Sequence, residues 1–139
     1  MKKVYWDTSA IVMALEDEHV RKYMEAHHSW TRTHTLAELF STLTGGRLPY
    51  QCSPDQAWDL IENVSQPITL FDIDTTEVKE YMAQAGNFGV RGGRVHDYLH
   101  ARAAQHCQAD ELLTLNTSDF EGLCDAVKIV TPTGGIGSG

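Results

Sequence analysis

The fold of this chain is decided by residues 3–10, which read KVYWDTSA. A short, mostly apolar run typical of a buried strand ends in an acid, and a helical pattern of apolar residues begins directly afterwards. In an open α/β sheet, ligands bind beyond the carboxyl ends of the strands. We therefore expect Asp7 to stand at the end of the first strand, at the edge of the sheet where a site would form.

Strands and helices alternate along the rest of the chain. Runs typical of strands occur at residues 30–34, 67–71, 112–115 and 127–130. Helical segments fall between them, at residues 17–28, 35–44, 54–64, 74–85 and from 94 onward. Because no two strands are close enough in sequence for a tight hairpin, we expect an α/β fold with three α/β/α layers and a mainly parallel central sheet of four to five strands.

Three of the expected helices carry an apolar stripe that should face the core. The stripes are Leu36, Leu39, Phe40 and Leu43; Ala57, Leu60, Ile61 and Val64; and Val78, Tyr81, Met82 and Ala85. The second helix is also preceded by a capping box, Ser53 to Gln56, with a proline at the first helical position.

Length and composition indicate one domain in a reducing compartment. At 139 residues the chain can bury a core without disulfides, and its three cysteines are widely spaced, with no secretory leader ahead of them. We expect a cytoplasmic protein with no membrane span. The net charge of −8, from 11 Lys and Arg against 19 Asp and Glu, argues against a sequence-independent nucleic-acid coat protein.

Polar residues follow several of the strands or open the next helix: Asp7, Glu38, Asp97, Asn116 and Asp119. In a parallel sheet such residues gather at one edge, although they are distant in sequence. Two carboxylates 5 Å apart repel by about 3 kcal/mol at an effective dielectric near 20, so several together need protons or a cation. Oxygen ligands without thiolates favour Mg²⁺ or Mn²⁺, which can activate water for phosphodiester hydrolysis.

Each of these residues also has a purely structural interpretation. Asp7 can be the N-cap of the first helix, Glu38 the capping-box partner of Thr35, and Asp97 a favourable charge in a first turn. Local pattern cannot exclude Asp74, which also follows a strand. From spacing alone, a shared metal site and a set of unrelated caps are about equally supported.

Four motifs in this order resemble the PIN domain, and most of all the VapC-type toxins of prokaryotes. They are DTSA at residues 7–10, TLAE at 35–38, GGRVHD at 92–97 and LTLNTSDF at 113–120, and the resemblance spans residues 4–130. It implies a PIN-like nuclease domain over residues 1–131, followed by a Gly-rich C-terminal tail at 132–139 that we expect to be disordered.

The resemblance implies roles for individual residues. Asp7, Glu38 and Asp97 would be the core acids that hold Mg²⁺ or Mn²⁺, and Asp119 a more distant acid. Many members of the family have an aspartate where this chain has Asn116, whose amide offers an oxygen but no charge. A second metal would therefore be held less tightly here, which favours a one-metal site or one assisted by Asp119.

Secondary residues complete the expected site. Ser9 and Thr114 would be hydroxyls close to the acids, and Arg94 would bind substrate phosphates together with Arg91, although solvated loop arginines are an equal alternative. As a whole, the resemblance implies a metal-dependent endoribonuclease that cleaves single-stranded RNA. Its partners would be a small antitoxin protein that blocks the site and a second copy of the chain in a homodimer.

Other functions remain open at this point. A non-catalytic PIN-like module that binds a protein or RNA is favoured by Asn116 and by the net charge of −8. A haloacid-dehalogenase-like phosphatase is weakened because Ser9 stands where that family's motif has a second aspartate, and a receiver domain because no lysine lies near the last strand's motif. A zinc site at His96 and His100 lacks a third nitrogen or sulfur ligand.

Overall fold

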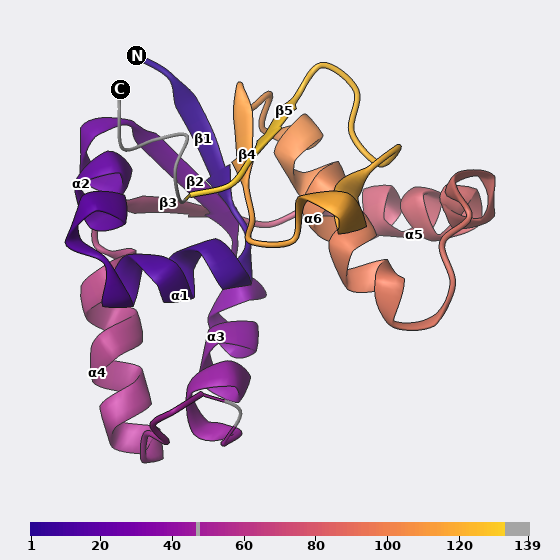
Figure 1. The fold of residues 1–139 in the computed structure, drawn as a ribbon. Helices are drawn as coiled ribbons and strands as arrows, with labels where there is room; N and C mark the ends of the chain where they lie inside the picture. The colour runs from indigo at the N-terminus through magenta and orange to yellow at the C-terminus, as the bar shows by residue number, and fades with distance from the viewer. Residues whose placement is uncertain (47, 133–139) are drawn as a thin grey trace.

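The centre of the molecule is a five-stranded parallel sheet with strand order β3-β2-β1-β4-β5 (Figure 1). The computed structural model describes residues 1–46 and 48–132. The strands are β1 Lys3–Trp6, β2 His28–Arg32, β3 Ile68–Phe71, β4 Glu111–Leu113 and β5 Lys128–Val130. The expected fold class, three α/β/α layers around a mainly parallel sheet, is confirmed.

Helices connect the strands, as parallel pairing requires. The α-helices are α1 Thr8–Glu16, α2 Glu18–Ala26, α3 Thr35–Thr44, α4 Pro54–Ser65, α5 Thr75–Gln84 and α6 Val95–His106, and three 3₁₀ turns are η1 Ala85–Phe88, η2 Gly92–Arg94 and η3 Thr117–Phe120. The capping box before α4 is confirmed, because the Ser53 side chain accepts from the Gln56 backbone N–H and the Gln56 side chain accepts from that of Ser53.

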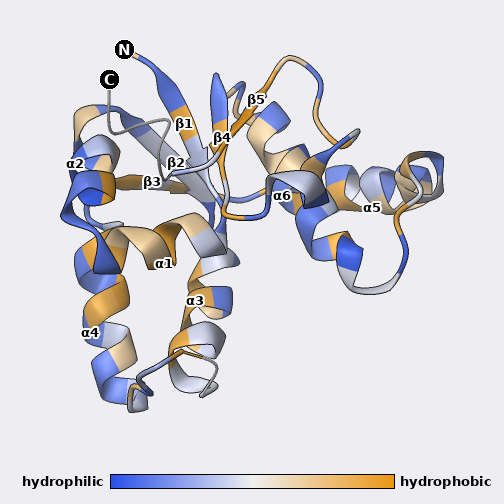
Figure 2. Ribbon diagram, in the orientation of Figure 1, coloured by the Kyte–Doolittle hydropathy of each residue, from blue (hydrophilic) through white to orange (hydrophobic). Residues whose placement is uncertain are grey.

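Two hydrophobic cores lie on opposite faces of the sheet. Alternate strand residues divide between them, so that Trp6 and Leu113 join one core while Tyr5 and Leu112 join the other. The first core lies beneath α1, α2, α3 and α4, and the second beneath α6 and η3. Figure 2 shows apolar colour over most of α1, the helix between the sheet and the α3–α4 pair.

Several expected core residues are exposed instead. Phe40 in α3 is 41% exposed, Leu60 in α4 is 37% exposed and Met82 in α5 is 39% exposed, and α5 contains no buried residue. Figure 1 shows α5 on the side of the molecule away from α1–α4. Helical periodicity identifies the apolar residues that share one face of a helix. Which of these residues become buried depends on the elements that pack against that face.

One boundary differs in a way that affects the site. The strand expected at residues 30–34 is β2, which begins at His28 and ends at Arg32, so Thr33 and His34 form the turn into α3. The chain turns there because Thr33 donates its backbone N–H to Phe71 of β3, and its carbonyl accepts from Leu36. The side chains of Arg32 and His34 consequently stand at the end of the sheet, close to Glu38.

The remaining expectations concern cysteines, membrane and tail. All three cysteines are free thiols. Within the described residues, the helices are too short or too polar to cross a bilayer. The expected Gly-rich tail at 132–139 lies, except for residue 132, outside the described residues. The division into residues 1–131 and a tail therefore stays a prediction.

Candidate active site

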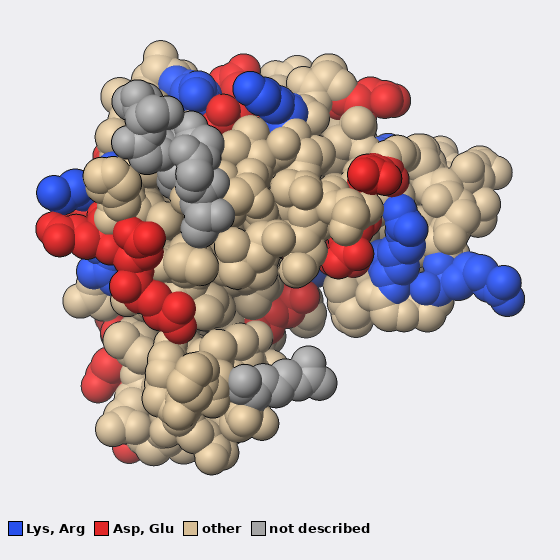
Figure 3. Space-filling view, in the orientation of Figure 1, with Lys and Arg blue, Asp and Glu red and all other residues tan. Residues whose placement is uncertain are grey.

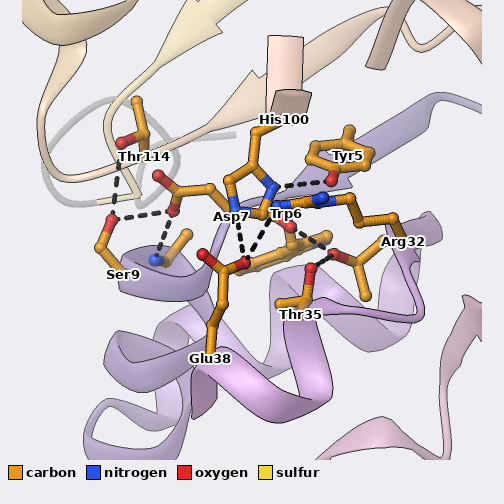
Figure 4. Close-up of polar contacts among 11 residues, drawn as sticks. Tyr5, Trp6, Asp7, Ser9, Arg32, Thr35, Glu38, His100 and Thr114 are labelled. Carbon is orange, nitrogen blue, oxygen red and sulfur yellow. Dashed lines mark hydrogen bonds and ion pairs between the residues drawn. The ribbon is translucent and has the colours of Figure 1, made fainter. Parts of the chain in front are cut away.

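Asp7 leaves β1 and caps α1, so the structural interpretation of this residue is correct. Its Oδ1 accepts from the Ala10 backbone N–H at 2.9 Å and from the Ser9 hydroxyl at 2.8 Å (Figure 4). A carboxylate has two oxygens and about four lone-pair sites, so capping uses only part of its acceptor capacity. Asp7 can serve as a cap and as a ligand at once.

The buried environment of Asp7 disfavours its ionised carboxylate when no cation is nearby. The side chain is buried, and burial raises the pKa of its carboxyl above the ordinary value despite the opposing influence of His100 and of the hydrogen bonds it accepts. A buried carboxylate with a raised pKa gains stability when a cation is placed against it. Asp7 therefore has the electrostatic character of a metal ligand.

Two further carboxylates approach Asp7 from other elements. Asp97 lies in the first turn of α6, and its pKa is raised by burial and then by the negative charges of Asp119 and Asp7. Asp119 lies exposed in η3, which follows β4. The three acids thus follow β1, open α6 and follow β4, and the charges of Asp7 and Asp119 both act on Asp97.

Glu38, on α3, faces a different set of neighbours. Its Oε1 lies 2.9 Å from Nε2 of His100 and 3.4 Å from Nη2 of Arg32 (Figure 4). Burial alone would raise the pKa of Glu38, but the hydrogen bond from His100 and the charge of Arg32 outweigh it and lower the pKa to about 2. Glu38 is therefore an ionised carboxylate at neutral pH.

His100, which the sequence analysis considered only as a zinc ligand, is the main contact of Glu38. It is buried between Tyr5, whose hydroxyl lies 2.7 Å from Nδ1, and Glu38 (Figure 4). Burial raises the pKa of Tyr5, so its hydroxyl keeps its proton and can donate it to Nδ1, while Nε2–H donates to Glu38. The alternative zinc site with His96 is not supported, because both ring nitrogens of His100 are already engaged.

Ser9 and Thr114 lie beside Asp7, as expected. The Ser9 hydroxyl donates to Asp7 and accepts from the Leu115 backbone N–H at 3.0 Å. Thr114 is fully buried, and its hydroxyl accepts from the Asn116 backbone N–H at 3.0 Å. These contacts join the segment after β4 to the start of α1, so both hydroxyls help to position the edge on which the acids stand.

Asn116 and Arg94 have more peripheral places. Asn116 is exposed and precedes η3 without a capping hydrogen bond from its side chain. Arg94 lies close enough to Asp97 to oppose the rise in its pKa, but its Nη2 donates to the Glu121 carbonyl at 3.2 Å. Arg94 is thus held against the neighbouring loop, on the side of the acids.

The type of donor atom in this set, carboxylate oxygen, is the type that hard divalent cations prefer. Asp7, Asp97 and Asp119 offer carboxylate oxygens, and their mutual repulsion is the condition that a cation relieves. As they stand, however, no three His, Cys, Asp or Glu side chains among the described residues form a group that would hold a metal ion. The expectation that Asp7, Glu38 and Asp97 share one ion stays a prediction.

Figure 3 shows the surface around these elements. A notch separates the part of the molecule built from α3 and α4 from the part built from α5 and α6. Acidic side chains line the notch, and basic side chains project from its α5–α6 side. An acidic floor with an adjacent basic wall suits a polyanion that is bound partly through divalent cations.

Comparisons with known proteins identify the fold. No protein-family model matches the sequence, and a search of curated proteins finds no match. Solved structures do match: VapBC2 from Rickettsia felis, bound to a DNA fragment from their promoter, has a TM-score of 0.69 at 16% identity, covering 93% of this chain and 98% of that one.

Two further structures agree with this result. A toxin–antitoxin complex from Klebsiella pneumoniae has a TM-score of 0.65 at 19% identity, covering 93% of this chain and 97% of the other. FitAB bound to an IR36 DNA fragment has a TM-score of 0.58 at 19% identity, covering 93% and 94%. At such identities the shared property is the fold, over nearly the whole length of each chain.

Proposed function

We propose that this chain, which has the fold of the VapC-type PIN domains, is a Mg²⁺- or Mn²⁺-dependent endoribonuclease and the toxin of a toxin–antitoxin pair. The observation that supports the proposal is the position of Asp97 in α6, where burial and the charges of Asp119 and Asp7, from two other elements, raise its pKa. A set of unrelated helix caps would have no reason to converge. The proposal is also supported by the general position of ligand sites in α/β sheets, which lie beyond the carboxyl ends of the strands.

In this mechanism Asp7 and Asp97 would hold the metal directly, and the exposed Asp119 would support them. A bound divalent ion would supply activated water and stabilise the leaving oxygen. Glu38 is the third core acid, either as a ligand or as the group that orients the attacking water. His100 acts as a positioning residue, because its hydrogen bond fixes Oε1 of Glu38 and Tyr5 fixes the imidazole in turn.

The proposed partners are RNA, a small antitoxin protein and a second copy of the chain. The antitoxin is supported by the toxin–antitoxin complexes that share the fold. Exposed apolar side chains on α3 and α4, among them Phe40, Trp58 and Leu60, offer surface for a protein partner. The free thiols of all three cysteines support a cytoplasmic location.

A second candidate function is a non-catalytic interaction module of the same fold. It is favoured by Asn116 and by the fact that no three potential ligands in the described residues are already arranged around an ion. Such a module would bind a protein or RNA through the same edge of the sheet without hydrolysing anything.

The experiment that separates the two compares Asp7→Asn and Asp97→Asn with wild type. We expect wild type to bind Mn²⁺ at a stoichiometric site in calorimetry and to cleave single-stranded RNA with Mg²⁺ but not with EDTA. Each substitution should lower cleavage by about 100-fold or more, the scale expected when a ligand of a catalytic metal is lost. The fold should be retained or slightly stabilised, because one repelling charge is removed.

Asp59→Asn, an exposed acid on α4, is the matched control and should cleave like wild type. RNA cleavage by Asp7→Asn at the wild-type rate would refute the assignment. The absence of a Mn²⁺ site in wild type, together with the absence of cleavage, would favour the interaction module.

A further inference from the structure

A pocket lies beside the acids and is not explained by metal binding. Its volume is about 360 Å³, and it is lined by residues from the ends of β2 and β3, from α5 and from α6. Its nitrogen-bearing side chains are those of Arg32, His34 and His96.

The nitrogen donors of these three side chains make few hydrogen bonds within the described part of the chain. Arg32 donates Nη2 to Glu38 at 3.4 Å, while its Nε is buried and has no hydrogen-bond partner among the described residues. His34 precedes α3 without a capping bond from its side chain, and His96 is exposed at the start of α6. An imidazole donates one N–H even when neutral, so these three side chains suit phosphate oxygens.

The rest of the lining has a different character. Ile73, Val78 and Leu99 are its apolar side chains, and Asp72 is the carboxylate among the lining residues. A lining that combines apolar side chains with nitrogen donors matches a ligand with a flat, weakly polar part and an anionic part. A nucleotide has this composition, and pockets that bind small ligands begin at about 300 Å³.

The pocket is joined to the candidate active site by two residues. Arg32 contacts Glu38 directly, as Figure 4 shows, and His96 precedes Asp97 in the chain. A nucleotide held here would therefore belong to the same strand that passes the acids. A base can enter such a pocket only from an unpaired strand, because bases of a duplex remain stacked.

We propose that this pocket binds one nucleotide of single-stranded RNA next to the scissile phosphate, with Arg32, His34 and His96 contacting the phosphate and the apolar side chains Ile73, Val78 and Leu99 contacting the base. The inference rests on the proposed function, since it names a subsite for that substrate. Arg32 has a double role, because it joins the nucleotide to Glu38.

The test measures RNA binding without cleavage. A short fluorescein-labelled single-stranded RNA is titrated in EDTA with wild type, His34→Ala and His96→Ala, and fluorescence anisotropy is recorded. Both side chains are exposed, so the variants should fold normally, which circular dichroism checks. We expect each substitution to weaken RNA binding by about 3- to 10-fold, as for the loss of one ordinary hydrogen bond.

His19→Ala in α2 is the matched control, since His19 does not line the pocket, and it should bind like wild type. Wild-type affinity in both pocket variants would overturn the subsite, even if Mg²⁺-dependent cleavage were intact. Weaker RNA binding in both variants, with no cleavage by wild type under any metal, would support the subsite and refute the nuclease. If wild-type protein neither binds nor cleaves RNA, both proposals fail.

Discussion

Glu38 is held between a histidine and an arginine that the sequence places far from each other, His100 on α6 and Arg32 at the end of β2. The hydrogen bond from His100 favours the ionised carboxylate, while burial opposes it. A group whose pKa is lowered by folding stabilises the folded state only while it is ionised. The environment of this one residue therefore makes a measurable prediction about acid stability.

In EDTA, the stabilisation contributed by Glu38 should be present above pH 4.5 and lost as the pH falls from 4.5 toward 2, because folding lowers the pKa from 4.5 to about 2. Glu38→Gln removes this titration. The difference in unfolding free energy between wild type and Glu38→Gln should therefore shrink by roughly 1–3 kcal/mol across that range, measured by urea denaturation at several pH values.

Glu62→Gln is a suitable control, since the exposed carboxylate of Glu62 makes no hydrogen bond or ion pair within the described part of the chain. Parallel pH curves for wild type and Glu38→Gln would show that the His100 and Arg32 contacts do not stabilise the ionised form.

At the scale of elements, α4 and α5 have similar apolar stripes but different surroundings. Ala57, Ile61 and Val64 of α4 are buried in the first core, whereas no residue of α5 is buried. Helix α5 contacts α6 through a polar pair at its surface, in which the Glu77 carboxylate lies 2.8 Å from Nδ1 of His106. The stability of α4 should thus depend on packing much more than that of α5.

Ile61→Ala in α4 should lower the unfolding free energy by about 2–4 kcal/mol, because it leaves a cavity in a closed core. Met82→Ala in α5 should lower it by less than about 1 kcal/mol, because that side chain is 39% exposed. Chemical denaturation of both variants gives the comparison. Equal losses of unfolding free energy in the two variants would contradict this prediction and would mean that Met82 is buried in solution.

At the scale of the whole molecule, one sheet separates two cores. Leu112 and Leu113 are consecutive residues of β4, both fully buried, and they belong to different cores. The central strands β1 and β4 therefore contribute to both faces at once. Loss of packing in one core should therefore destabilise the sheet, and with it the other core.

Leu112→Ala and Leu113→Ala should each lower the unfolding free energy by about 2–5 kcal/mol and still give a single cooperative transition. Far-ultraviolet circular dichroism and tryptophan fluorescence should report the same midpoint. Leu70→Ala on the edge strand β3 is the control and should have a smaller effect, since Leu70 is more exposed. Separate transitions for the two probes would show that the cores unfold independently.

The sequence by itself determined the order and type of the elements. Most strands contain a short apolar run, and several helices begin at a local signal, such as the capping box at Ser53 or the capping side chains of Asp7 and Asp74. These signals act between neighbouring residues, so they can be read without a fold. The parallel sheet follows from the alternation of strands and helices, which also predicts the edge at which Asp7, Asp97 and Asp119 would gather.

Only the tertiary structure decided what surrounds Glu38. Tyr5, Arg32 and His100 stand on three different elements, and their contacts around Glu38 depend on how α3, α6 and the sheet pack. The exposure of Phe40, Leu60 and Met82 was decided in the same way. Contacts between distant segments are set by the packing of whole layers, and no spacing within one segment carries that information.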